Sequence, residues 1–331
     1  MAHFPQPERI ATNGIELAVW QKKPAGNAHA LPIVFCHGFP ELGYSWRHQL
    51  DAAAAAGFHA IAPDLRGYGR SDVPDDTTSY DMKTATADVA GLVKALGYDK
   101  AIFVGHDFGG MLVWALPFYQ PDMIAGIASI CTPFTPRAKN EPISMFNHIY
   151  GENNYINRFQ EPGFMEARFD PDPGKLFRMM MRVDEGQGTP LGQAGHLDTG
   201  MMEWWAKIET DEATWPGRVF LDEDELQFYV DAYNAAGGFK GGFNWYRCLS
   251  RTWEDMAQFY PEGVRIKLDF PTLQMMPDAD PSSPPMLADG MPKFCTDYDY
   301  KLITGAGHWA QQEQPAQVNA ALTDWLERKF S

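Results

Sequence analysis

Short apolar runs alternate with helical patterns over the first 130 residues. The apolar runs occupy residues 33–36, 58–62, 101–104 and 124–130, and helical patterns occupy 45–56, 81–96 and the stretch after Gly109. A strand that is apolar on both faces must be covered on both faces. This order therefore predicts an α/β fold, a mostly parallel sheet flanked by helices.

Asn13-Gly14 stands between two short stretches of strand-forming residues, 8–11 and 15–19. An Asn-Gly pair favours the tight turn in which both central residues have positive φ, and this is the strongest short signal for a hairpin. We therefore expect the chain to open with two antiparallel strands.

The strand rhythm stops after residue 130 and returns near the end of the chain. From about residue 137 to 253 the sequence is rich in Met, Trp, Gly and acidic residues and shows helical fragments. Strand-like runs reappear at 270–276 and 300–303, and an amphipathic helix covers 315–330. We predict a core domain of residues 1–136 and 254–331, interrupted by a helical insert of residues 137–253.

Charge and composition narrow the function. The 331 residues include 27 Lys and Arg against 43 Asp and Glu, which gives a formal net charge of −16. This balance repels nucleic acid phosphates and anionic membrane surfaces. With no apolar run of signal-peptide or membrane-spanning length, the expected location is the cytoplasm. The four cysteines lie far apart without metal-ligand spacing, so neither disulfides nor a structural metal are expected.

The most informative segment is 104–110, which reads VGHDFGG between a predicted strand and a predicted helix. Glycines around one polar residue are typical of a nucleophile elbow, a sharp turn that raises one side chain above the sheet. Here that residue is Asp107. A carboxylate can attack an alkyl carbon and form an ester, which opens epoxides or expels halides. The alternative is that Asp107 only caps the following helix.

The other parts of such a site also have candidates. His308 follows the last predicted strand and is the candidate base. The acid that orients the base should follow the strand at 270–276, where Asp278 and Asp280 both stand. A loop N–H from residues 37–40 could pair with the N–H of Phe108 to hold an oxyanion. His37 and His106, beside glycines, are interpreted as structural hydrogen-bonding residues.

The chain resembles the soluble epoxide hydrolases of the α/β-hydrolase superfamily over nearly its whole length. The matching motifs are HGFP at 37–40, GHDFGG at 105–110 and GHW at 307–309. The resemblance implies an α/β-hydrolase fold in which the insert is a helical cap. It also implies that Asp280 is the orienting acid and that the N–H groups of Phe39 and Phe108 form the oxyanion hole.

In that family the cap carries two tyrosines that bind the epoxide oxygen. The segment NWYR at 244–247 matches one tyrosine context and assigns the role to Tyr246. The second family tyrosine precedes a segment like FQEPG at 159–163, which points to Tyr155, with Tyr150 as the alternative. Two phenol O–H groups could hydrogen-bond the oxygen and supply a proton as the ring opens.

The expected partners are a small apolar epoxide and water, without cofactor, metal, nucleic acid or membrane, and with a homodimer left open. A detoxification role is expected. The side chains of Phe39, Phe108 and Trp309 are the predicted substrate contacts, although the family commonly has Trp at position 108. The methionines at 179–181 and 201–202 and the tryptophans at 204–205 favour the hydrophobic core, with a cavity lining as the alternative.

Two other functions compete. A haloalkane or haloacid dehalogenase uses the same fold and Asp nucleophile, but it usually holds its substrate with Trp or Arg directly after the nucleophile. Phe108 offers neither donor. A non-catalytic ligand-binding protein of this fold would commonly lack part of the catalytic set, whereas this sequence has candidates for every part. Asp in place of Ser disfavours an esterase.

Overall fold

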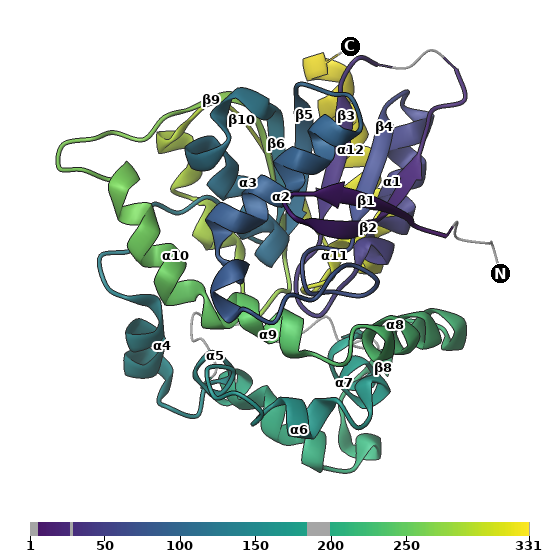
Figure 1. Ribbon diagram of the computed structural model, residues 1–331, viewed down its shortest axis with the longest axis vertical. Coiled ribbons are helices and arrows are strands. Elements are labelled where there is room, and N and C mark those ends of the chain that lie inside the picture. Colours follow the sequence, from purple (N-terminus) through teal and green to yellow (C-terminus); the bar gives the residue numbers. More distant parts are fainter. Residues whose placement is uncertain (1–5, 27–28, 184–198, 331) are drawn as a thin grey trace.

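The computed structural model describes residues 6–26, 29–183 and 199–330. Eight strands form one sheet in the order β1-β2-β4-β3-β5-β6-β9-β10 (Figure 1). Among the described strands of this sheet, only the pairs β1–β2 and β2–β4 are antiparallel. The strands are β1 (Glu8–Thr12), β2 (Ile15–Lys22), β3 (Pro32–Cys36), β4 (His59–Pro63), β5 (Ala101–His106), β6 (Ile124–Ile130), β9 (Leu268–Pro277) and β10 (Cys295–Ile303). The predicted mostly parallel sheet is confirmed.

The predicted hairpin joins β1 to β2. Asn13 and Gly14 both have positive φ, 42° and 79°, as this turn type requires. The resulting antiparallel pair forms one edge of the sheet.

Helices cover both faces of the sheet, as the apolar runs predict. α1 (Arg47–Ala55) packs with α12 (Pro315–Phe330), and α2 (Met82–Ala95) packs with α3 (Phe108–Tyr119) on the opposite face. Side chains alternate along a strand, so Val34 joins the core beneath α2 and α3, whereas Ile33 and Phe35 join the core beneath α1 and α12.

Some element boundaries differ from the prediction. α1 begins at Arg47 because residues Gly43–Trp46 form a 3-10 turn. β10 begins at Cys295, five residues before the predicted run. Its first half is mostly polar, with Asp297, Tyr298 and Asp299 half-buried on an edge strand. Such a segment carries no continuous apolar signal.

The insert between β6 and β9 is mainly helical. Its helices are α4 (Pro142–Tyr150), α5 (Tyr155–Arg158), α6 (Glu166–Phe169), α7 (Pro173–Met180), α8 (Glu223–Ala235), α9 (Lys240–Arg247) and α10 (Leu249–Met256). Two short strands that the sequence did not predict, β7 (Arg182–Val183) and β8 (Arg218–Val219), pair antiparallel within it. Helices α4 to α8 lie together below the sheet in Figure 1. Within the described ranges no helix is long and apolar enough to cross a membrane.

Candidate active site

Asp107 lies in a sharp turn between β5 and α3. Its backbone has φ 52° and ψ −119°, a region that non-glycine residues rarely adopt and that is typical of functional sites. The neighbouring glycines allow close packing, because a Cβ at Gly109 would lie 1.9 Å from the Cys36 carbonyl oxygen. The Asp107 carboxylate makes no capping hydrogen bond to α3. A nucleophile elbow therefore describes this turn better than a helix cap.

The loop after β3 approaches the Asp107 carboxylate directly. The backbone N–H of Phe39 donates to Asp107 Oδ1 at 2.9 Å. A Cβ at Gly38 would lie 2.4 Å from Asp107 Cβ, so only glycine fits there. The N–H of Phe108 lies in the first residue of α3. The structure thus brings the predicted Phe39 donor to the nucleophile.

His308 follows β10 and faces both predicted carboxylates. Its Nδ1 lies 2.8 Å from Asp280 Oδ2, and its Nε2 lies 3.8 Å from Asp107 Oδ2. The longer distance exceeds that of a hydrogen bond, so Nε2 remains available to a water molecule. Asp278 instead accepts from the backbone N–H groups of Gly305 and Ala306. Of the two candidate acids, the structure places Asp280 against the histidine.

Electrostatics couple this pair. Burial on its own raises the pKa of Asp280, but the charge and hydrogen bond of His308, with hydrogen bonds from Ser282, lower that pKa to about 2. Burial on its own lowers the pKa of His308, but the charge and hydrogen bond of Asp280, together with the nearby Cys131, outweigh burial and raise that pKa. Asp280 therefore remains a carboxylate, and His308 is a stronger base than an ordinary histidine.

Tyr155 of α5 and Tyr246 of α9 line the same cavity as Asp107 and His308. The cavity holds about 280 Å³, and the two phenol rings lie 5.8 Å apart between centroids. Burial raises the pKa of both hydroxyls, and the negative charge of Asp107 adds to it. Both phenols therefore keep their protons at neutral pH and can donate hydrogen bonds.

Of the remaining residues predicted for the pocket, some line the cavity and others lie outside it. Phe39 and Trp309 line the cavity. The Phe108 side chain is not among its lining residues and packs against Trp245 and Tyr246, with centroid distances of 5.7 and 4.6 Å. Tyr150 also lies outside the lining and stacks on Phe146.

The methionines and tryptophans expected in the core serve both environments. Met181 and Met202 are buried core residues, and Met179, Met180 and Trp204 pack against the core. The residues that also line the cavity are Met179, Met180, Met202 and Trp204. These side chains come from the insert, where one side of each packs on the core and another side borders the cavity. Periodicity in short helices could not distinguish these two apolar environments.

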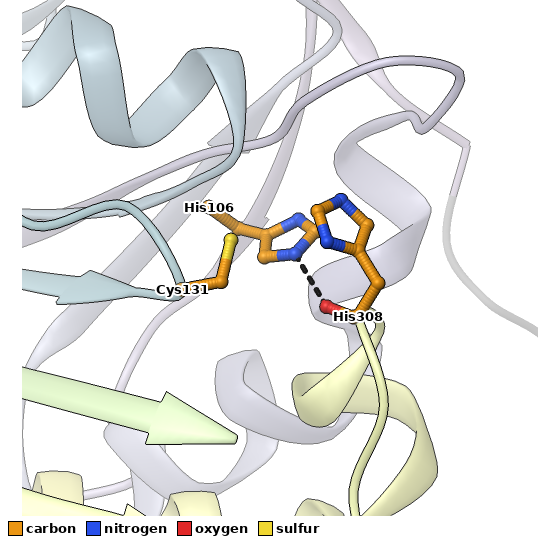
Figure 2. Close-up of side chains that lie close together, drawn as sticks. All are labelled: His106, Cys131 and His308. Carbon is orange, nitrogen blue, oxygen red and sulfur yellow. Dashed lines mark hydrogen bonds between the residues drawn. The ribbon is translucent and has the colours of Figure 1, made fainter. Parts of the chain in front are cut away.

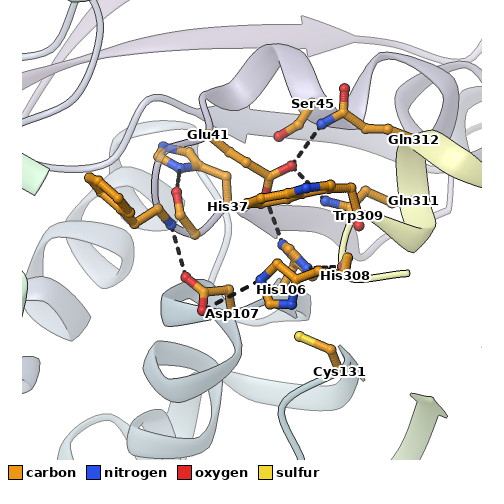
Figure 3. A network of polar contacts seen from close by, with 12 residues as sticks. His37, Glu41, Ser45, His106, Asp107, Cys131, His308, Trp309, Gln311 and Gln312 are labelled. Carbon is orange, nitrogen blue, oxygen red and sulfur yellow. Dashed lines mark hydrogen bonds and ion pairs between the residues drawn. The ribbon is translucent and has the colours of Figure 1, made fainter. Parts of the chain in front are cut away.

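A buried ion pair that the sequence pattern did not predict lies behind the site (Figure 3). His106 Nδ1 lies 2.7 Å from Glu41 Oε2, and His106 Nε2 lies 2.7 Å from the His308 carbonyl oxygen. Both partners can only accept, so both ring nitrogens carry protons and His106 is an imidazolium ion. Gln311 and Gln312 donate to the other Glu41 oxygen. The sequence feature that could have indicated this pair is Glu41, the acid directly after the HGFP motif.

His37 has the opposite protonation state. Its Nε2 accepts from the backbone N–H of Leu65, and its Nδ1 donates to the Gly38 carbonyl oxygen. Burial lowers its pKa to about 4. The interpretation of His37 and His106 as structural hydrogen-bonding residues agrees with these contacts.

His106, Cys131 and His308 offer three potential metal-ligand atoms within 4.8 Å of one another (Figure 2). However, Glu41 and the His308 carbonyl oxygen already take both nitrogens of His106, and Asp280 takes His308 Nδ1. A metal ion bound to His106 would have to break the buried pair. The donor set therefore fits a hydrogen-bonded network better than a metal centre.

Fold and site together define an α/β hydrolase, and residues 32–315 match the alpha/beta hydrolase fold family. Over 97% of both chains, the protein is 37% identical to Epoxide hydrolase A of Mycobacterium tuberculosis. The crystal structure of Epoxide Hydrolase A from Mycobacterium thermoresistibile has a TM-score of 0.83 at 35% identity, covering 98% of both chains. An epoxide hydrolase from an endophytic Streptomyces has a TM-score of 0.83 at 30% identity, covering 98% of this chain and 96% of the other. The chain belongs to the epoxide hydrolase family.

Proposed function

We propose that this protein hydrolyses an epoxide to a vicinal diol through a covalent ester of Asp107. One observation carries the proposal: a single cavity is lined by a carboxylate nucleophile, a histidine paired with an acid, and two protonated phenols. The family membership described above supports the same activity. In this proposal residues 137–253 form the cap and residues 1–136 and 254–331 form the hydrolase core.

The first step opens the ring. An Asp107 oxygen attacks one ring carbon, the C–O bond to that carbon breaks, and its electron pair stays on the epoxide oxygen. Tyr155 and Tyr246 hydrogen-bond this oxygen and supply the proton that makes it a hydroxyl group. The product is a hydroxyalkyl ester of Asp107.

The second step hydrolyses the ester. His308 Nε2 takes a proton from water while the water oxygen attacks the carbonyl carbon of the Asp107 ester. Asp280 holds the imidazole ring and stabilises its positive charge. The N–H groups of Phe39 and Phe108 hold the oxyanion. Collapse of this intermediate breaks the bond between the carbonyl carbon and the diol oxygen, and that oxygen takes the proton held by His308. The second proton of the water restores the tyrosine that gave its proton in the first step, and Asp107 returns to a carboxylate.

A dehalogenase is the second candidate, and two features of the cavity disfavour it. The Phe108 ring has no N–H to hold a leaving halide. The indole N–H of Trp309, which lines the cavity, already donates to the Met180 carbonyl oxygen at 3.1 Å. Neither step of the mechanism uses a cofactor or metal. Location in the cytoplasm, a homodimer and a detoxification role stay predictions.

The decisive experiment compares diol formation from styrene oxide with halide release from haloalkanes and haloacetates. We expect diol without halide, and no diol from an Asp107→Ala variant. A His308→Gln variant should still open the ring and accumulate the ester, which mass spectrometry of the intact protein detects as a mass increase of one substrate. Halide release alone would assign the protein to the dehalogenases. Absence of the ester in His308→Gln, with turnover by the unaltered protein, would contradict the two-step mechanism.

A further inference from the structure

A second cavity, of about 230 Å³, lies between α3, the loop after β6 and α10. It is nearly as large as the catalytic cavity of about 280 Å³, so it has room for a ligand. Among the described residues, none lines both cavities. We call the second cavity the aromatic pocket, because its walls include Trp114, Phe118, Phe134, Trp253 and Met256.

The two indole N–H groups at the aromatic pocket are already hydrogen-bonded. Trp114 donates to the Thr132 carbonyl oxygen at 2.8 Å, and Trp253 donates to the Ala138 carbonyl oxygen at 2.8 Å. Neither indole therefore remains free to pair with a polar group of a ligand. Burying a polar group without a partner costs free energy, so the pocket suits the apolar part of a ligand.

The aromatic pocket continues into a surface hollow that carries cations. The two spaces share Pro136 and Tyr260. The hollow is formed by the segment between α10 and β9, at the left of Figure 1, and by the turn before β10. Its positively charged residues are Arg265, Lys267 and Lys293. We call these three side chains the cationic rim.

The protein does not neutralise the cationic rim. Its three side chains are exposed, and within the described ranges no carboxylate forms an ion pair with them. Lys267 donates to a neutral acceptor, the Lys293 carbonyl oxygen, at 3.4 Å. Arg137 in the pocket wall adds a fourth positive charge, and it donates to the Trp253 carbonyl oxygen at 2.6 Å. On a chain with a net charge of −16, this cluster indicates an anionic ligand.

We propose that the aromatic pocket and the cationic rim together bind a single-chain amphiphile with an anionic head. The tail fills the pocket, where apolar surface is removed from water, and the head lies on the rim. A free amphiphile is favoured over an anionic membrane, because the aromatic side chains enclose a cavity and the net charge repels a negative bilayer. The site goes beyond the proposed function, since no described residue belongs to both cavities.

Calorimetric titration tests the proposal with octyl sulfate, octyl glucoside and inorganic sulfate, the first two below the concentrations at which they form micelles. At low salt we expect octyl sulfate to bind at least about tenfold more tightly than either other probe, since each exposed charge pair contributes up to about fivefold. Salt should shrink this difference, because it screens exposed charges. Equal binding of octyl sulfate and octyl glucoside would overturn the proposal.

Charge reversals locate the head. Arg265→Glu combined with Lys267→Glu should weaken octyl sulfate binding by about tenfold or more and leave octyl glucoside within about twofold. The matched control is Lys23→Glu combined with Lys100→Glu, at two exposed lysines that do not line the groove. It changes the net charge by the same amount. Equal weakening in both double variants would show that the rim does not bind the head.

Photochemical labelling locates the tail. An alkyl sulfate with a diazirine at the end of its chain is cross-linked to the protein, and peptide mass spectrometry should find the label on α3 or α10. Label confined to residues of the catalytic cavity would overturn the proposal. Binding to phosphatidylglycerol vesicles by a protein that does not bind octyl sulfate would also overturn it, in favour of a membrane surface.

Turnover separates this inference from the proposed function. The Arg265→Glu and Lys267→Glu double variant should form diol from styrene oxide within about twofold of the unaltered protein, because neither residue lines the catalytic cavity. Loss of octyl sulfate binding with unchanged turnover supports a separate site. Turnover that falls in parallel with octyl sulfate binding would place the amphiphile in the catalytic cavity and reject the inference.

Discussion

Tyr155 and Tyr246 approach the cavity from different helices, α5 and α9, and each can donate one hydrogen bond to the epoxide oxygen. We predict that Tyr155→Phe and Tyr246→Phe each slow ring opening by about 10²-fold, the lower end of the range for general acid catalysis. Rapid-quench measurement of Asp107 ester formation checks this. Tyr150→Phe is the matched control and should leave the rate unchanged, because its ring stacks on Phe146 outside the cavity lining. Equal loss in all three variants would contradict the assignment.

The contact between Asp280 and His308 also predicts how the rate of ester hydrolysis depends on pH. His308 must be neutral to accept a proton from water, so ester hydrolysis rises with pH as His308 loses its proton. Burial lowers the pKa of His308 and the Asp280 charge raises it, with a net increase. Asp280→Asn removes the raising charge. The acidic limb of the hydrolysis profile should therefore move to lower pH, while the maximal rate falls because the ring is held less firmly.

The measurement is the single-turnover decay of the ester as a function of pH. Asp278→Asn serves as the control, because Asp278 binds backbone N–H groups of the histidine loop rather than the ring. An acidic limb that stays in place in Asp280→Asn, or moves equally in both variants, would show that Asp280 does not set the pKa of His308.

At the scale of single residues, sequence predicted those groups whose position depends on a short local motif. Asp107 and His308 stand in glycine-rich turns after strands, so their placement at the carboxyl edge followed from the sheet. The choice between Asp278 and Asp280 depended on which way a loop turns, which the residues alone left open and the family resemblance decided. Glu41 acts through its contact with His106, which is 65 residues away in the sequence, and only the folded chain shows it.

At the scale of elements, the close packing of β3, β5 and α3 depends on glycine. A Cβ at Gly109 would press into the backbone of Cys36 at 1.9 Å. We predict that Gly109→Ala lowers the free energy of unfolding by about 3 kcal/mol, the upper part of the usual range for overpacking. Gly290→Ala is the control, since nothing lies within 4 Å of its added Cβ and its φ is −78°. Urea unfolding of both variants checks the difference, and similar midpoints would contradict it.

Whether the sequence predicts a strand depends on how deeply that strand is buried in the sheet. Central strands β3, β5 and β6 are buried on both faces, and their continuous apolar runs mark them clearly. The first half of β10 lies at an edge and is mostly polar, so the sequence did not predict where this strand begins. The two-residue strands β7 and β8 have no sequence signal of their own, because their pairing depends on how the insert folds.

At the scale of the whole molecule, the site is built where two kinds of structure meet. The sheet provides the nucleophile, the base, its acid and an oxyanion donor from the ends of four parallel strands. The insert provides both tyrosines and most of the apolar lining. The alternation of apolar runs with helical patterns predicted the sheet well. The cavity itself was not predictable, because its shape depends on packing between short helices that lack a clear period.

The buried pair of Glu41 and His106 joins three segments that are far apart in the chain: the loop after β3, the end of β5 and the loop that carries His308. Loss of either partner alone leaves an uncompensated charge in the interior, which is strongly destabilising. The two positions should therefore be inherited as a unit. A loop exchanged with a relative that lacks this acid will be accepted only if residue 106 changes with it.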